Sequence, residues 1–194
     1  MSSANTFAFN VLYCVRPDLN YARHKHVVAN LKRAVDHEVP TVILFRDPAD
    51  CIPSAVARFR PSLPEALHRY LFFYQHVIEE MKSDVLLISF EEMTQEVEPT
   101  VRRICSFADL DVDNDLLEGV EERAKDRIRR RTKQRTDSTE QISLPREKRE
   151  QRKSEIRDEL VQHPKYIEAE GLYRQLQATH ERQHQGEKNS MSIR

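Results

Sequence analysis

Two short apolar runs in the first half of the chain have the pattern of strands covered on both faces. Residues 41–45 read Thr-Val-Ile-Leu-Phe and residues 85–90 read Val-Leu-Leu-Ile-Ser-Phe. Continuous β-branched runs of this length are typical of a parallel sheet buried between helices. Between them, apolar residues recur at helical spacing from Leu63 to Met81. Strand, helix and strand in this order predict a right-handed βαβ unit.

Other apolar positions predict further helices around this unit. Helical spacing is present in residues 20–37, in residues 96–107 and in a segment that starts near Asp113. Residues 7–15 are ambiguous, because their apolar positions fit an alternating strand as well as a buried helix.

The second half of the chain is more polar than the first. Residues 129–141 contain no apolar side chain, which predicts a mobile basic loop. Two helices are expected from about Pro145 and Lys165, and their thin apolar stripes predict positions on the outside of the fold. We expect a single domain over residues 1–180 and a polar, disordered tail over residues 181–194.

Composition narrows the classes of function. The chain has 194 residues and a formal net charge of -1, so whole-chain charge favours neither nucleic acid nor an anionic membrane as a partner. Cys14, Cys51 and Cys105 are odd in number and far apart, which predicts a reducing, cytoplasmic compartment and no zinc site. No apolar run reaches the roughly 18 residues that a membrane span needs, and the first residues lack the pattern of a signal peptide.

An arginine follows the first predicted strand directly. Ligands of open α/β sheets bind outside the carboxyl ends of the strands, where Arg46 is placed. Ser54 follows eight residues later, near the first turn of the next helix, and an arginine with a hydroxyl at a helix start can clamp a phosphate. The alternative stays open that Arg46 pairs with Asp47 or Asp50, and that Ser54 is only a helix cap.

The segment from Val42 to Ser54 resembles the motif with which sulfotransferases dependent on PAPS (3′-phosphoadenosine 5′-phosphosulfate) bind the 3′-phosphate of that cofactor. The residues that match in register are Arg46, Pro48, Asp50 and Ser54. The resemblance extends to the aromatic positions Tyr70 and Tyr74, the pair Phe90-Glu91, and the stretch from Cys105 to Leu110. It implies an α/β fold of three layers, a P-loop NTPase-like parallel sheet flanked by helices, which here would lack its first strand.

The first residues resemble, in part, the loop that binds the 5′-phosphosulfate in this family. Ser3, Asn5 and Thr6 can be aligned with hydroxyl-bearing positions of that loop, and Phe7 would then begin a buried helix. Ala4 stands where the family has glycine, and Ser2 where it has a basic residue. An ordinary helix cap is the alternative for these residues. The departures indicate either a native start upstream of Met1 or a degenerate cofactor site.

The resemblance also implies a general base, usually a histidine beside a lysine. Residues 23–26 read Arg-His-Lys-His, and we predict His26 as the base and Lys25 as the nearby cation. The alternative is a histidine on the solvated surface. A third ligand for a metal is not evident beside His24 and His26, so no metal is predicted.

A cluster of basic residues lies between Arg123 and Arg135. In the family a late basic loop closes over the 3′-phosphate, and the candidates for that role are Arg129 and Arg130, together with Arg131 and Lys133. A solvated helix end and a polyanion contact are the alternatives.

The implied function is transfer of a sulfuryl group from PAPS to a hydroxyl or amine of a small-molecule or carbohydrate acceptor. One alternative is a non-catalytic relative that binds a nucleotide or a partner, and another is a polyanion-binding module. A nucleotide kinase is disfavoured, because the chain has no Gly-x-x-x-x-Gly-Lys-Ser/Thr loop.

Overall fold

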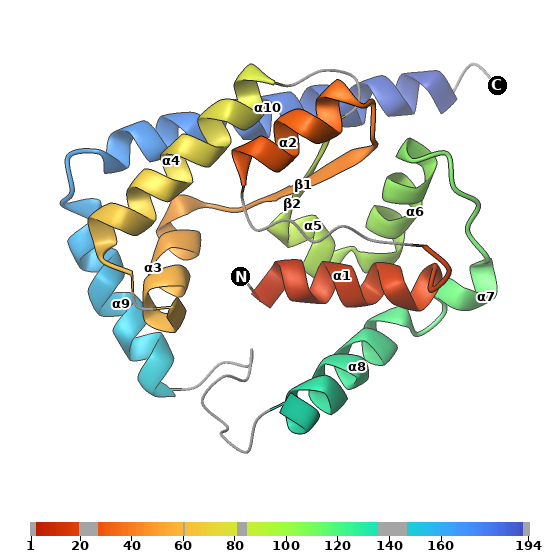
Figure 1. Ribbon diagram of the computed structural model, residues 1–194, viewed down its shortest axis with the longest axis horizontal. Coiled ribbons are helices and arrows are strands. Elements are labelled where there is room, and N and C mark those ends of the chain that lie inside the picture. Colours follow the sequence, from red (N-terminus) through yellow and green to blue (C-terminus); the bar gives the residue numbers. More distant parts are fainter. Residues whose placement is uncertain (1–2, 20–26, 60, 81–84, 136–146, 192–194) are drawn as a thin grey trace.

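The computed structural model describes residues 3–19, 27–59, 61–80, 85–135 and 147–191. Two parallel strands, β1 (Thr41–Phe45) and β2 (Val85–Ser89), lie between two groups of helices (Figure 1). The helices are α1 (Ser3–Val15), α2 (Val28–Asp36), α3 (Pro48–Phe59), α4 (Leu63–Glu79), α5 (Phe90–Gln95), α6 (Val97–Phe107), α7 (Asn114–Leu117), α8 (Val120–Arg135), α9 (Glu147–Val161) and α10 (Tyr166–Met191).

Successive side chains of the strands point to opposite faces of the sheet, and each face has its own apolar core. Ile43 and Phe45 face the core that β1 shares with α2, α3, α4, α9 and α10. Val42 and Leu44 face the core formed by α1, α5, α6, α7 and α8. Both faces are therefore covered, which is why the two strands read as continuous apolar runs in the sequence.

The predicted βαβ unit is confirmed, with two helices rather than one in the crossover. Thr41 pairs with Val85 and Phe45 with Ser89, in parallel register. The second strand ends at Ser89 because that residue caps α5: its hydroxyl accepts from the Glu92 N–H, and the Glu92 carboxylate accepts from the Ser89 N–H. The sheet formed by the described residues has two strands, so the wider P-loop-like sheet that the resemblance implies is not seen in this part of the chain.

The helical alternative for residues 7–15 is confirmed by α1. The helix predicted over residues 20–37 is observed as Val28–Asp36, and residues 20–26 lie outside the described part. The single helix expected from Asp113 is two helices, because Gly119 takes a left-handed conformation (φ 63°) between α7 and α8.

The mobile loop predicted from Arg129 is wrong at its start, because α8 continues to Arg135. Charged side chains one turn apart support this polar helix: Lys125 pairs with Glu121 at 2.6 Å and Arg129 with Asp126 at 2.8 Å. Residues 136–141 of the predicted loop lie outside the described residues.

The disordered tail predicted from residue 181 is also wrong, because α10 continues to Met191 and covers the sheet. Leu176 is fully buried, and the polar side chain of Gln183 reaches the free edge of β2. Its Oε1 accepts from the Leu87 N–H at 3.0 Å, and its Nε2 donates to the Val85 carbonyl at 2.8 Å.

We expect Gln183→Ala to lower the free energy of unfolding by about 2 kcal/mol, because it leaves two backbone groups of a buried strand unpaired. For a chain of this size the melting temperature should fall by roughly 4–8 °C. Thermal unfolding followed by circular dichroism measures the change. Gln185→Ala, an exposed neighbour on the same helix, is the control and should unfold like the parent.

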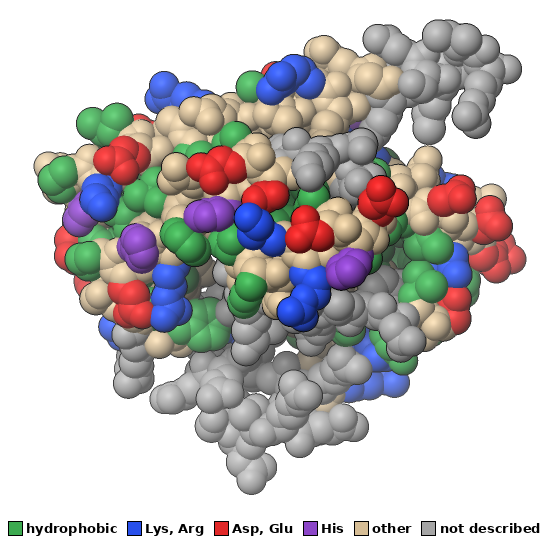
Figure 2. All heavy atoms as spheres, turned by 45° about the horizontal axis from the view of Figure 1, so that its top comes forward, with side chains coloured by type: hydrophobic (Ala, Val, Ile, Leu, Met, Phe, Trp, Pro, Cys, Tyr) green, Lys and Arg blue, Asp and Glu red, His purple; other side chains and the backbone are tan. Residues whose placement is uncertain are grey.

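The outer surface of α2 and α4 carries interspersed charges. Figure 2 shows acidic, basic, histidine and apolar side chains mixed over this face of the molecule. This side therefore presents no extended field of one sign. Within the part of the chain that the structure describes, no helix is both long and apolar enough to cross a membrane.

Candidate functional site

The chain turns into α3 immediately after β1, and this turn carries the candidate site. Asp47 caps the helix: its carboxylate accepts from the Ala49 N–H at 2.7 Å. Pro48 occupies the first helical position, where the missing N–H costs nothing. The helix therefore begins at once, and Ser54 lies in its second turn rather than near the first turn as predicted.

The side chain of Arg46 is held at the carboxyl end of β1 and is only 18% exposed. Its Nη2 pairs with Asp50 Oδ2 at 3.1 Å, and its guanidinium carbon lies 4.0 Å from the centre of the Phe90 ring. The Nε atom is buried without a hydrogen-bond partner among the described residues. The arginine is thus partly paired, in line with one of the two interpretations of the sequence, and still has a buried donor to offer.

Two tyrosines from α4 support the end of β1. The hydroxyl of Tyr70 donates to the Arg46 carbonyl, and that of Tyr74 donates to the Leu44 carbonyl, each at 3.0 Å. Burial raises the pKa of both hydroxyls well above the ordinary value, so both stay protonated donors. The aromatic positions of the resemblance therefore position the backbone that carries Arg46.

Asp50 is shared between two arginines. Besides Arg46, it pairs through Oδ1 with Nη2 of Arg157 on α9. The Nε of Arg157 donates to the Ala49 carbonyl at 3.0 Å. Arg157 was not among the predicted site residues, since its only signal in the sequence is its charge on a helix with a thin apolar stripe.

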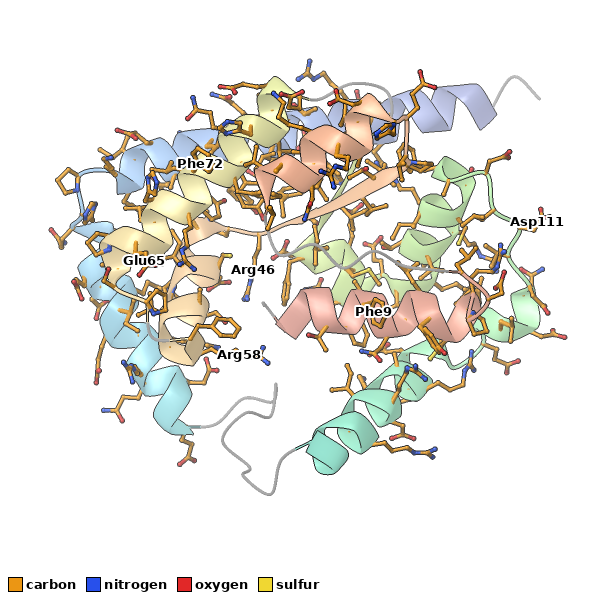
Figure 3. All side chains as sticks on the ribbon, in the orientation of Figure 1. Phe9, Arg46, Arg58, Glu65, Phe72 and Asp111 are labelled. Carbon is orange, nitrogen blue, oxygen red and sulfur yellow. The ribbon has the colours of Figure 1, made fainter. Side chains whose placement is uncertain are left out.

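Ser54 lies one helical turn after Asp50 on the same face of α3, and Arg58 lies one turn further. The Ser54 side chain is half-buried, and no hydrogen bond joins it to another described residue. In Figure 3 the side chains of Arg46 and Arg58 extend toward the side of the molecule where α1 begins. Arg46 at the start of α3 and this face of the helix therefore offer cationic groups and a hydroxyl, the kinds of donor that bind a phosphate.

The first turn of α1 contains Ser3, Ala4, Asn5 and Thr6, which were predicted to form a loop before the helix. The helix begins at Ser3 rather than at Phe7. Alanine favours the helix, and no glycine is present to open a loop. The Thr6 carbonyl accepts from the Asn10 side chain at 2.7 Å. α1 packs against α5, and the ring of Phe90, the first residue of α5, lies against the Arg46 guanidinium.

No described contact joins the other predicted site residues to Arg46. His26 and Lys25 lie outside the described residues. Arg129 and Arg130 are exposed on α8, which packs along α1, and Arg129 pairs with Asp126. Their role toward a phosphate stays a prediction.

The described residues of the basic cluster on α8 make several contacts within the chain. Arg123 donates to the carbonyls of Leu116 and Glu118, and Arg127 lies with its guanidinium carbon 3.7 Å from the centre of the Tyr13 ring. Lys125 and Arg129 are paired to carboxylates of the same helix. Among the described side chains, no group of three or more His, Cys, Asp or Glu could hold a metal ion.

Comparison with known proteins identifies the family. The family model described as the sulfotransferase domain matches residues 19–165, which include β1, α3, α4, β2 and α9. A search of curated proteins and a search of solved structures each found no match. The matched residues make up most of the chain and contain Arg46, Asp50, Ser54 and Arg157. The chain therefore belongs to the sulfotransferase domain family.

Proposed function

We propose that this protein transfers a sulfuryl group from PAPS to a hydroxyl or amine of a small-molecule or carbohydrate acceptor, and that Arg46 and Ser54 bind the 3′-phosphate of the cofactor. The observation that carries the proposal is the buried, unpartnered Nε of Arg46 at the carboxyl end of β1. A buried donor without an acceptor costs about 1–3 kcal/mol, which a bound phosphate oxygen would recover.

The residues present fit a phosphate group. Two guanidinium groups share one carboxylate, so Arg46, Asp50 and Arg157 together carry one net positive charge. The Ser54 hydroxyl can donate to a second phosphate oxygen, and Tyr70 keeps the Arg46 backbone in place. The first turn of α1 supports a second anion position, because backbone N–H groups at a helix start favour negative charge.

The chemistry itself is assigned from the resemblance. PAPS would supply the activated sulfuryl group. His26 would remove the proton of the acceptor as sulfur is attacked, and Lys25 would stabilise the charge that develops on the transferring group. Arg129 and Arg130 are proposed to approach the 3′-phosphate from the end of α8.

Calorimetric titration with adenosine 3′,5′-bisphosphate tests the proposal, with adenosine 5′-monophosphate as the matched ligand that lacks the 3′-phosphate. We expect the bisphosphate to bind at least tenfold more tightly, because a charged hydrogen bond contributes about 1.5–3 kcal/mol. Equal affinities, or binding of neither nucleotide, would refute the assignment of this site.

Ser54→Ala should weaken binding of the bisphosphate by about 2- to 10-fold, the scale of one hydrogen bond, and should leave binding of the monophosphate unchanged. Ser62→Ala is the control, since Ser62 is an exposed cap at the start of α4. Release of adenosine 3′,5′-bisphosphate from PAPS in the presence of hydroxyl and amine acceptors then separates a transferase from a non-catalytic relative.

A further inference from the structure

One arginine of α9 joins that helix to the first turn of α3. Arg157 lies 107 residues from Asp50 in the sequence, yet its Nη2 pairs with Asp50 Oδ1. Its Nε donates to the Ala49 carbonyl at 3.0 Å. Two contacts to adjacent residues hold the guanidinium plane in one orientation, although the side chain is 47% exposed.

The position of Arg157 follows from the sequence of α3 itself. In an α-helix the Ala49 carbonyl would accept from the N–H of residue 53. Residue 53 is a buried proline, which has no N–H, so this carbonyl lacks its regular helical donor. Arg157 supplies the missing donor. Pro53 therefore leaves the Ala49 carbonyl available to Arg157, and this contact places Arg157 beside Asp50.

This placement changes how strongly Asp50 binds Arg46. Asp50 uses one oxygen for each arginine: Oδ2 for Arg46 and Oδ1 for Arg157. Without Arg157, both oxygens of Asp50 could turn to Arg46, because a carboxylate and a guanidinium favour a bidentate pair. Arg46 would then be neutralised by its own neighbour and would attract an anion less.

We propose that Arg157 is a positioning residue that draws Asp50 away from Arg46 and so keeps the Arg46 guanidinium available to a phosphate. The inference rests on the proposed function, because the phosphate meant here is the 3′-phosphate of the nucleotide. Arg157 acts through Asp50 and does not itself touch the ligand. Asp50 is thus an internal competitor of the ligand, and Arg157 limits that competition.

Four chains titrated with adenosine 3′,5′-bisphosphate test the proposal: the parent, Arg157→Ala, Asp50→Asn, and the double variant. Arg157→Ala should bind about 5- to 10-fold more weakly than the parent, because Asp50 then pairs fully with Arg46. Asp50→Asn should bind as tightly as the parent or more tightly. The double variant should bind like Asp50→Asn. Arg152→Ala, an exposed arginine on the same helix, should bind like the parent.

Recovery of affinity in the double variant separates positioning from the alternatives. If Arg157 only stabilised the packing of α9 on α3, removing the carboxylate of Asp50 would not restore binding. If Arg157 bound the phosphate directly, its removal would cost as much in the Asp50→Asn chain as in the parent. Either result overturns the proposal, as does an unchanged affinity in Arg157→Ala.

A ligand-free measurement keeps this inference separate from the proposed function. The Nε–Hε signal of Arg46 in ¹⁵N NMR should shift in Arg157→Ala, because the pairing with Asp50 changes, and the same substitution should not shift it when residue 50 is asparagine. An Arg46 signal that Arg157→Ala leaves in place would overturn the inference. A parent chain that binds no nucleotide would overturn the proposed function, while the NMR result would still decide the role of Arg157.

Discussion

Arg46→Ala is expected to weaken binding of adenosine 3′,5′-bisphosphate by about 10- to 100-fold. The substitution removes the charged donors at the carboxyl end of β1, and a hydrogen bond to a charged group contributes about 1.5–3 kcal/mol. Arg46→Lys should recover part of the affinity, because lysine restores the charge but not the planar fork that matches a phosphate. Calorimetric titration measures both variants against the parent.

Two controls are needed for this variant, because Arg46 also lies over Phe90 and pairs with Asp50. Thermal unfolding shows whether the loss of affinity comes from a less stable chain. Arg69→Ala removes an arginine of α4 that is 70% exposed and pairs only with Glu65 among its described contacts. It should bind the nucleotide like the parent. An Arg46→Ala chain that is folded and keeps full affinity would contradict the assignment of the 3′-phosphate to this turn.

The second large effect is expected at Glu92, where α5, α6 and α10 meet. Its Oε2 lies 2.7 Å from His180 Nε2, and its Oε1 lies 3.2 Å from Arg103 Nη1. The side chain is 19% exposed. Burial alone would raise the pKa of this carboxyl, but the hydrogen bonds from His180 and Ser89 outweigh it and lower the pKa from 4.5 to about 2.

A pKa that is lower in the folded chain than in the unfolded chain stabilises the fold only when the group is ionised. The contribution of Glu92 is therefore complete above about pH 4.5 and is lost as the pH falls toward 2. Its size at neutral pH is about 3 kcal/mol, at 1.36 kcal/mol for each pKa unit. Acid should therefore loosen α10 from the rest of the fold.

Glu92→Gln should lower the free energy of unfolding at neutral pH by about 2–3 kcal/mol, because the amide keeps some hydrogen bonds but leaves Arg103 and His180 without their carboxylate. Between pH 5 and pH 3 the variant should lose less stability than the parent. Urea unfolding at several pH values measures both effects. Glu91→Gln, an exposed neighbour, is the control. Parallel pH profiles of parent and Glu92→Gln would contradict the assignment.

The sheet and the helix crossing over it could be predicted because their signals are local. β1 and β2 are buried on both faces, so nearly every residue is apolar, and α4 buries one stripe at regular spacing. The position of Arg46 could also be predicted, because this residue directly follows its strand. Its pairing with Asp50 was one of two interpretations, and the structure shows that this pair coexists with a buried free donor.

The parts that could not be predicted depend on polar contacts rather than on an apolar period. α8 extends to Arg135 through ion pairs along its own surface, and the end of α10 is held by Gln183 and His180. Such residues resemble a solvated loop or tail when only hydrophobicity is examined. Arg157 is a similar case, because its partners Ala49 and Asp50 are more than 100 residues away along the chain.

The side chains along the outer edge of β2 limit how the sheet can grow. Gln183 forms hydrogen bonds with the Val85 carbonyl and the Leu87 N–H, and Glu92 accepts one from the Ser89 N–H. These are groups that an incoming strand would have to pair with, so this edge resists the edge-to-edge association through which sheets aggregate. A further strand, from this chain or from another, would therefore have to join beside β1, next to the turn that carries Arg46.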